Sequence, residues 1–260
     1  MTAIEKVISI ATNEIGYLEK ATNSQLDNKT ANAGYNNWTK YARDMDNLNM
    51  YNGKKNGYAW CDMFFDWCMV QAFGVETALK ITGQKLKGEG AGCTSSANYY
   101  KSIGQFFKTN PRPGDQIFFS NDGGKSMNHT GLVVKVTKDR VYTIEGNTSS
   151  AAGVVANGGA VRDKSYAINY SKIGGYGRPK YELVEEEDED MTQEKFNEMM
   201  NNYIATLAEK PATFEQDALI WAQSNGLLIG DEKGNLMAKK FVTRGEFVVV
   251  LKRLVERVFK

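Results

Sequence analysis

Apolar side chains recur at helical spacing in two segments of the first half of the chain. In the first twenty residues they occupy Ile4, Val7, Ile8, Ala11 and Ile15. A second segment, AWCDMFFDWCMVQAFG, repeats the spacing from Trp60 to Cys68 and reaches a common helix terminator at Gly74. Apolar residues three and four positions apart fall on one helix face, so both segments predict amphipathic helices.

The pattern changes from about residue 114 onward, where short β-branched and aromatic runs alternate with turn residues. Four runs predict strands: Gln116–Ser120, Thr130–Val136, Arg140–Glu145 and Lys172–Tyr181. Between the two helical segments, residues 21–58 are rich in Asn, Gly, Lys and Asp, which is typical of loops. Helices followed by neighbouring strands indicate an α+β fold with an antiparallel sheet.

An acidic run separates this region from the end of the chain. Residues 185–190 are all acidic, and such a block repels itself and stays solvated. Residues 1–182 hold 22 basic and 16 acidic side chains, whereas residues 183–260 hold 10 and 15. We predict two domains, 1–182 and 193–260, joined by a linker at 183–192, although the run could equally serve only solubility.

The residues after this linker predict helices. Residues 191–209 carry apolar side chains on one side, at Phe196, Met199, Met200, Tyr203, Ile204 and Leu207. A further helix over 214–224 ends at an Asn-Gly turn. Thr243, with Glu246 three residues later, forms the pattern of a capping box that starts a last helix. We therefore expect a small, mainly α-helical module.

Composition argues against several classes of protein. The three cysteines form neither an even set nor a CxxC pair. The single histidine rules out a metal site that needs two histidine ligands. We expect no disulfide framework, no metal and no cofactor. No run of 18 apolar residues occurs, so we expect no membrane insertion. The charged first twenty residues do not resemble a signal peptide, which indicates synthesis in the cytoplasm.

Cys61 is the first candidate for chemistry because it opens the second predicted helix directly after a loop. The positive end of a helix dipole favours a thiolate, whereas a free thiol with a pKa of roughly 8.5 is mostly protonated at neutral pH. A dipole and a nearby imidazole can together produce a nucleophile that attacks an amide. Alternatively, Cys61 is a small buried core residue, the more common fate of a free cysteine.

His129 opens the predicted strand HTGLVVKV, so it should lie at the rim of the sheet. The next strand, VYTIEGN, ends in Glu145 and Asn147, which should share a face because residues two apart on a strand point the same way. Either side chain could hold the second imidazole nitrogen and direct the ring toward the thiolate. Alternatively, His129 is a hydrogen-bonded surface histidine, Glu145 is a solvated strand end, and Asn147 is a turn residue.

The other two cysteines are weaker candidates. Cys68 follows Cys61 by two helical turns among aromatic residues, and we interpret it as core. Cys93 precedes a predicted helix start at residues 94–96 and would need the same histidine. Five aromatic residues lie in the loops: Tyr35, Trp38, Tyr41, Tyr51 and Tyr58. They could line a groove for sugar or peptide, although such residues more often pack beneath loops.

Residues 1–181 resemble a CHAP domain, the cysteine, histidine-dependent amidohydrolase/peptidase module of bacterial and phage cell-wall enzymes. The resemblance rests on five segments in the same order: Trp60-Cys61, Arg112-Pro113-Gly114-Asp115, Asn128–Val133, Ile144–Thr148 and Gly175–Pro179. It implies a papain-like α+β core in which Cys61 is the nucleophile and His129 is first the base and then the acid. Glu145 and Asn147 would orient and polarise His129.

Two further expectations follow from this resemblance. The oxyanion hole would use the backbone N–H of Cys61 and a second donor, for which Tyr58 is a candidate. Some CHAP domains bind calcium through acidic residues just before the nucleophile, but residues 52–60 read NGKKNGYAW. Asp44 and Asp46 lie farther upstream without the rest of an EF-hand loop, so we predict no calcium site there.

Residues 214–254 resemble a single S-layer homology repeat. The resemblance rests on Trp221-Ala222, Asn225-Gly226-Leu227, Gly230, Gly234 and Thr243–Glu246. In that family the repeat holds secondary cell-wall polymers, usually with three copies together. One copy of about 45 residues has a thin core, so the resemblance implies either a homo-oligomer or another binding role. Residues 191–209 could add a partner helix or pack on the module.

These patterns together lead us to expect a peptidoglycan hydrolase, an endolysin that cleaves an amide of the stem peptide or cross-bridge. It would act on the bacterial wall after release from the cytoplasm. We expect peptidoglycan as partner, a secondary cell-wall polymer as a second candidate, and no nucleic acid. Two alternatives stay open: a wall-binding protein with a vestigial hydrolase domain, and an intracellular papain-like amidase.

Overall fold

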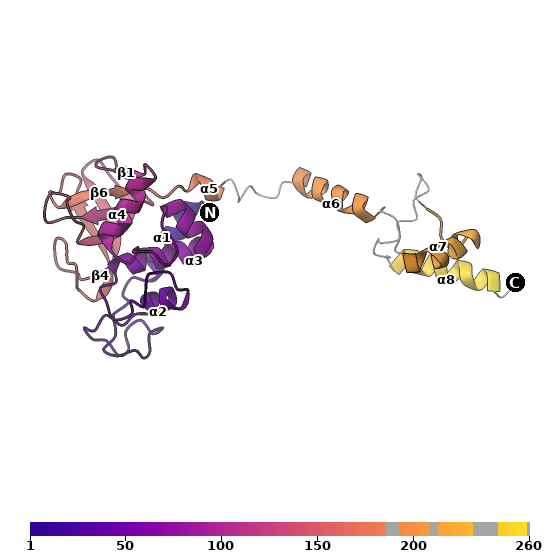
Figure 1. The fold of residues 1–260 in the computed structure, drawn as a ribbon, viewed down its shortest axis with the longest axis horizontal. Coiled ribbons are helices and arrows are strands. Elements are labelled where there is room, and N and C mark those ends of the chain that lie inside the picture. Colours follow the sequence, from indigo (N-terminus) through magenta and orange to yellow (C-terminus); the bar gives the residue numbers. More distant parts are fainter. Residues whose placement is uncertain (186–192, 208–212, 231–243, 259–260) are drawn as a thin grey trace. The chain divides into compact units, whose positions relative to one another are not determined.

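The computed structural model describes residues 1–185, 193–207, 213–230 and 244–258. The chain divides into two compact units, Met1–Asp188 and Glu189–Lys260, and each is described here by itself (Figure 1). Most of the predicted linker at 183–192 lies outside the described residues.

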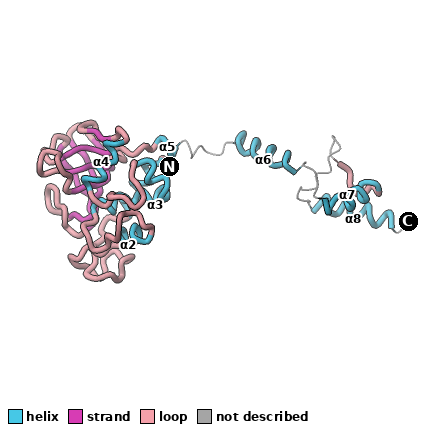
Figure 2. Tube along the Cα trace, in the orientation of Figure 1, coloured by secondary structure: helices cyan, strands magenta, loops and turns pink. Residues whose placement is uncertain are grey.

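The first unit contains a six-stranded antiparallel sheet in the order β1-β6-β2-β3-β4-β5 (Figure 2). The strands are β1 (Phe106–Phe107), β2 (Gln116–Phe119), β3 (His129–Val136), β4 (Arg140–Thr148), β5 (Ala160–Ala167) and β6 (Ile173–Gly177). Four of them confirm the predicted strands, whereas β1 and β5 were not predicted. Leu132 of β3 pairs with Ile144 of β4, which brings the start of β3 beside the end of β4.

Five helices accompany this sheet: α1 (Ala3–Asn13), α2 (Lys40–Asn47), α3 (Cys61–Thr82), α4 (Cys93–Ser102) and α5 (Glu182–Glu185). The long α3 packs against α1, α2, β3 and β4, and α4 lies against β1 and β6 (Figure 1). Val7, Tyr41, Phe64 and Leu132 belong to the main apolar core that these elements share. The helices, followed by an antiparallel sheet, confirm the α+β fold class.

The helix α3 continues beyond the point where the sequence predicted its end. Gly74 has a φ of 77° and a ψ of 168°, and the helix resumes after it and runs to Thr82. Glycine adopts a positive φ without steric cost, so Gly74 kinks the helix instead of ending it. The left-handed Gly83, with a φ of 72°, forms the C-cap.

The first unit extends slightly past the predicted boundary at residue 182. Val184, in the short α5, is only 8% exposed and lies in the main core. Removing the chain from residue 183 onward would therefore expose part of this apolar core to water.

The second unit contains three described helices: α6 (Gln193–Leu207), α7 (Thr213–Ser224) and α8 (Arg244–Val258). They confirm the predicted mainly α-helical character of this part of the chain. Gly226 has a φ of 64°, and Leu227 after it is buried, so the predicted Asn-Gly turn is present. Thr243, the predicted capping residue of the last helix, lies outside the described residues.

Several large apolar side chains of the second unit are exposed. Ile220 and Trp221 on α7, and Phe247, Val248 and Val255 on α8, each expose more than half of their surface. Large exposed apolar side chains of this kind, where they gather in one patch, mark a binding or assembly face. Within the described ranges, no helix is long and apolar enough to cross a membrane.

Candidate active site

Cys61 is held at the first turn of α3 by its neighbour Trp60. Trp60 is the N-cap residue, with a φ of −120° and a ψ of 16°, and its side chain does not cap the helix. Its indole is fully buried, and Nε1–H donates to Oε2 of Glu19 at 2.8 Å. The loop that leads into α3 is therefore anchored, and the free N–H groups and positive dipole of the helix end lie beside the Cys61 thiol.

His129 lies at the start of β3 and, although it stands at a strand end, it is fully buried. Its ring stacks on Phe119, with ring centroids 5.9 Å apart and an interplanar angle of 25°. Nε2 lies 2.9 Å from Oε2 of Glu145. Nδ1 is buried, and no described group forms a hydrogen bond with it. It is therefore the nitrogen available to the Cys61 thiol.

Glu145, in β4, is fixed by three hydrogen-bond donors. Oε2 accepts from His129 and also from the Tyr166 hydroxyl at 3.2 Å, and Oε1 accepts from the Thr143 hydroxyl at 2.6 Å. Gly131 of β3 makes room for this carboxylate, since a Cβ there would lie 2.4 Å from Cγ of Glu145. A carboxylate only accepts, so it keeps the proton of His129 on Nε2 and fixes the direction of the ring.

Asn147 is placed at the same strand end but does not contact His129. Its Oδ1 accepts from the N–H of Gly159 at 3.3 Å, and its Nδ2 lies 3.5 Å from Oδ1 of Asn37. Its φ of 54° breaks the alternation of side chains that the sequence argument assumed. These contacts tie the end of β4 to neighbouring loops, and a role of Asn147 in orienting His129 stays a prediction.

The thiol and the imidazole shift each other's protonation. The hydrogen bond with Cys93 lowers the pKa of Cys61 well below its usual value, against the effect of burial, and the nearby His129 lowers it further. Burial would lower the pKa of His129, but the nearby Cys61 sulfur and the hydrogen bond with Glu145 outweigh it and raise this pKa to about 10. These shifts favour a thiolate–imidazolium pair, a form that attacks amides.

A cysteine at a helix start, a histidine that opens a strand and a carboxylate on the next strand are thus in place. Residues 53–147 match the CHAP domain. This match indicates a cysteine, histidine-dependent amidohydrolase or peptidase, and it suggests peptidoglycan as the substrate. It spans Cys61, His129, Glu145 and Asn147. Comparison with curated proteins gave no match.

Directly behind the nucleophile of this CHAP segment, Asp62 is completely buried. It lies 2.6 Å from the Ser96 hydroxyl and accepts from Nε2 of Gln116 at 2.7 Å. Burial raises the pKa of Asp62 well above its usual value. The Ser96 hydroxyl donates to Oδ2 of Asp62 and also lies 3.0 Å from the carbonyl oxygen of Gly90. Asp62 therefore ties the start of α3 to α4 and β2.

Cys93, which the sequence offered only as an alternative to Cys61, is a direct neighbour of Cys61 in the structure. It opens α4, and its Sγ lies 3.6 Å from the Sγ of Cys61. The hydrogen bond with Cys61, together with burial, raises the pKa of Cys93 well above its usual value, so this thiol keeps its proton. Cys68, by contrast, is fully buried in the main core, as its interpretation as a core residue requires.

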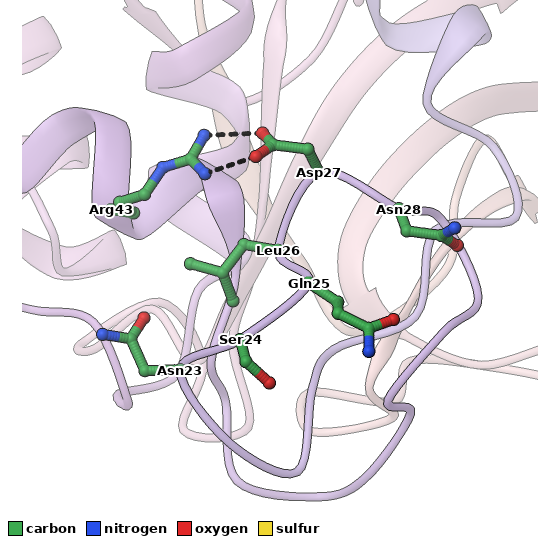
Figure 3. A pocket seen from close by; sticks show the side chains of 7 residues that line it. All are labelled: Asn23, Ser24, Gln25, Leu26, Asp27, Asn28 and Arg43. Atoms are coloured by element: carbon green, nitrogen blue, oxygen red, sulfur yellow. Dashed lines mark hydrogen bonds and ion pairs between the residues drawn. The ribbon is translucent and has the colours of Figure 1, made fainter.

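A surface hollow in the first unit lies among loop residues and is not lined by Cys61 or His129. Its volume is about 540 Å³, and its lining consists of Asn23, Ser24, Gln25, Leu26, Asp27, Asn28 and Arg43 (Figure 3). The Arg43 guanidinium donates to both oxygens of Asp27, at 2.8 and 2.7 Å. Because this charge is already matched, the hollow offers amide and hydroxyl groups instead of a free charge.

The loop aromatic residues divide into three groups. Tyr41 and Tyr51 are buried in the main core and cannot line a groove. Tyr35 and Tyr58 are 90% and 65% exposed. Tyr35 also lines a smaller hollow of about 180 Å³ that includes Gly159, the partner of Asn147. Trp38 is half-buried. The candidates for an aromatic groove are therefore Tyr35, Tyr58 and the half-buried Trp38.

The two acidic residues upstream of the nucleophile already have hydrogen-bond donors. Asp46 accepts from the N–H groups of Lys55 and Asn56 at 2.7 and 3.0 Å, and Asp44 accepts from Nε1 of Trp67 at 2.9 Å. Asp46 therefore organises the loop that precedes α3, and Asp44 links α2 to α3. Among the described residues, no group of three or more His, Cys, Asp or Glu side chains is placed to hold a metal ion.

Proposed function

We propose that this protein is a peptidoglycan hydrolase of the endolysin type, which cleaves an amide bond of the stem peptide or cross-bridge through Cys61 and His129. The observation that carries this proposal is the placement of Cys61 at the start of α3 beside His129, whose Nε2 lies 2.9 Å from Glu145. The lowered pKa of Cys61 and the raised pKa of His129 support it. The match of residues 53–147 to the CHAP domain supports the substrate class.

In the first half-reaction, the Cys61 thiolate attacks the carbonyl carbon of the scissile amide. The electron pair of the C=O bond moves to oxygen, and the oxyanion is stabilised by the backbone N–H of Cys61 at the positive end of α3. The His129 imidazolium donates its Nδ1 proton to the leaving nitrogen as the C–N bond breaks. The products are a free amine and a thioester on Cys61.

In the second half-reaction, neutral His129 takes a proton from water at Nδ1 while the water oxygen attacks the thioester. The C–S bond breaks, a carboxylic acid is released, and the thiolate–imidazolium pair is restored. Glu145 holds the Nε2 proton through both halves, so Nδ1 keeps facing the sulfur. The same imidazole therefore serves as acid in one step and as base in the next.

For the second unit we propose a role in concentrating the enzyme at the wall, either by binding a secondary cell-wall polymer or by self-association. The exposed apolar side chains of α7 and α8 support a binding or assembly face. The chain after residue 182 contains no histidine and no cysteine, so it lacks the groups of the proposed reaction. Linked binding sites raise the local concentration of the enzyme without any new catalytic contact.

Clearing of a suspension of Gram-positive cells tests the hydrolase proposal, with Cys61→Ala as the inactive variant and Cys68→Ala as the matched control. Loss of the nucleophile costs on the order of 10⁴-fold, so Cys61→Ala should retain less than about a thousandth of the rate. Cys68→Ala should still clear cells. Mass spectrometry of digested walls should show new amine and carboxyl ends from one type of amide.

Two results would contradict this proposal. One is intact clearing by Cys61→Ala, which excludes a covalent mechanism at this sulfur. The other is the absence of any cleaved amide when folded wild-type protein is incubated with purified walls. That second outcome would favour a vestigial wall-binding domain or an amidase of small molecules instead.

A further inference from the structure

Two sulfur atoms lie together at the centre of the site, and the proposed reaction uses only one of them. The Sγ of Cys93 is 3.6 Å from the Sγ of Cys61. The two residues are only 8% and 5% exposed. Amide hydrolysis needs one thiolate and one imidazole, so the second sulfur has a position that the proposed reaction does not explain.

The two helix starts that carry these sulfurs are tied together by hydrogen bonds. Asp62, the residue after one cysteine, lies 2.6 Å from the hydroxyl of Ser96, which follows the other cysteine by one turn. The Thr94 hydroxyl accepts from the N–H of Met127 at 2.9 Å, which links α4 to the segment leading into β3. The approach of the two sulfurs is therefore built into the packing of α3, α4 and β3.

The remaining surroundings of this sulfur pair are apolar. They consist of Ala97, Tyr100, Phe118 and Met127, with Phe106 packed against them. Packing explains a small apolar residue at position 93, but it does not explain why the sulfur faces the nucleophile. In this environment the pKa of Cys93 is raised and the pKa of Cys61 is lowered, which favours a thiolate at Cys61, the form of cysteine that a peroxide oxidises.

The distance between the sulfurs is short enough for a bond to form. A disulfide has an S–S length of about 2.05 Å, so the atoms must approach by roughly 1.5 Å. Both cysteines occupy the first position of a helix. No preceding helical turn restricts their χ1 angles there, so side-chain rotation can supply much of the movement.

We propose that Cys61 and Cys93 are a redox pair, which a hydroperoxide converts into a disulfide that reversibly silences the enzyme. This inference rests on the proposed function because it takes Cys61 as the catalytic nucleophile. Cys93 is the resolving thiol, and the oxidant is of the peroxide class, which oxidises thiolates.

The chemistry takes two balanced steps. The Cys61 thiolate attacks one oxygen of hydrogen peroxide, the O–O bond breaks and hydroxide leaves, which gives a sulfenic acid. In this step sulfur loses two electrons and the peroxide is reduced. The Cys93 sulfur then attacks the Cys61 sulfur, the S–O bond breaks, and the Cys93 proton departs with the hydroxyl group as water. Thiolate, thiol and peroxide become a disulfide, water and hydroxide.

The presence of Cys93 decides whether oxidation can be reversed. A dithiol reductant restores both cysteines by thiol–disulfide exchange. Without a resolving thiol, the sulfenic acid at Cys61 reacts with further peroxide and gives sulfinic and sulfonic acids, which dithiols do not reduce. The pair therefore turns permanent loss of the nucleophile into a temporary one.

The test uses the full-length protein treated with hydrogen peroxide and measures the bond and the activity separately. Oxidised wild type should be about 2 Da lighter, and its digest should contain the Cys61 and Cys93 peptides joined together. At full conversion the rate of wall cleavage should fall by more than about a hundredfold, because the nucleophile is blocked. Dithiothreitol should restore the rate of the untreated protein.

Cys93→Ser is the decisive variant and Cys68→Ala is the matched control. In Cys93→Ser, peroxide should add about 32 or 48 Da at Cys61, and dithiothreitol should not recover the variant's own untreated rate. Cys68→Ala should behave as wild type in both measurements. Reversible inactivation of Cys93→Ser to the wild-type extent overturns the inference, and so does a wild-type bridge that includes Cys68.

The two proposals fail in different ways. A protein that cleaves walls but forms no Cys61–Cys93 bridge under peroxide refutes only the redox pair. A protein that forms the bridge but cleaves no peptidoglycan in its reduced state refutes the hydrolase proposal and leaves the sulfur chemistry in place. If Cys93→Ser does not fold, peptide mapping of the wild type alone still decides whether the bridge forms.

Discussion

Replacing Glu145 by glutamine removes a buried negative charge from the site while nearly preserving the shape of the side chain. Oε2 of Glu145 lies 2.9 Å from Nε2 of His129, and both side chains are completely buried. A hydrogen bond to a charged group contributes about 1.5–3 kcal/mol. An amide oxygen can still accept the Nε2 proton, so Glu145→Gln removes the charge assistance and keeps the contact.

We expect this change to alter both the rate and its dependence on pH. Since about 1.4 kcal/mol corresponds to a factor of ten, kcat/KM at neutral pH should fall by about 10- to 100-fold. The wild-type imidazolium loses its proton only as the pH approaches its raised pKa of about 10, so activity should decline there. Without the negative charge, this alkaline decline should move to lower pH by about one to two units.

The assay is release of free amines from purified walls between about pH 6 and pH 11. Tyr166→Phe is the matched control, because it removes a 3.2 Å hydrogen bond to the same carboxylate and leaves the charge. It should cost less than about tenfold, with the alkaline decline unmoved. If Glu145→Gln folds normally by circular dichroism and keeps the wild-type alkaline decline, this carboxylate does not hold the imidazolium.

Three further predictions concern the stability of the first unit, the role of calcium and the role of the second unit. Asp66 is a buried residue of α3, and burial raises its pKa from 3.8 to about 7. The proton that it binds therefore stabilises the folded state, and this stabilisation is lost as the pH rises from about 4 to about 7. Urea unfolding should therefore show a flatter pH dependence for Asp66→Asn, and equal slopes would contradict the shift. EDTA and added calcium should give equal rates of clearing, because Asp44 and Asp46 already have donors; a loss that calcium restores would reveal a metal site. Deleting residues 189–260 should slow the clearing of whole cells and leave the cleavage of soluble muropeptides unchanged. Equal clearing by the full-length and shortened proteins would contradict the wall-binding role. Light scattering that finds both proteins monomeric would contradict self-association.

Regular apolar spacing made most helices and strands predictable. The exceptions include β1, β5 and α2 (Lys40–Asn47), which lies within residues 21–58 that were predicted to be loops. The two-residue β1 is too short to carry a period, and β5, AVRDKSYA, contains three charged residues among its eight. β5 forms because the neighbouring β4 offers a partner along its length, from Arg140 opposite Ala167 to Thr148 opposite Ala160. Pairing of this kind depends on the tertiary fold, which local patterns do not report.

At the site, too, the sequence located residues on predicted elements but not contacts that depend on tertiary packing. Cys61, His129 and Glu145 come together because a helix start and two adjacent strand ends converge, as the sequence indicated; their catalytic roles belong to the proposal. Thr143 could have been found from the two-residue alternation with Glu145. The contact between Cys93 and Cys61 could not have been predicted, because it joins residues 32 positions apart through the packing of two helix starts.

The bond between the Trp60 indole and the Glu19 carboxylate reaches outside the segment that matches the CHAP domain. The backbone beside Glu19 is joined to β5, where Leu18 pairs with Ala160. A chimeric enzyme that received only residues 53–147 would bury an indole N–H without its acceptor and would lack β5 and β6. A transplantable cassette should therefore begin at Thr2, the capping residue of α1, and continue through Val184.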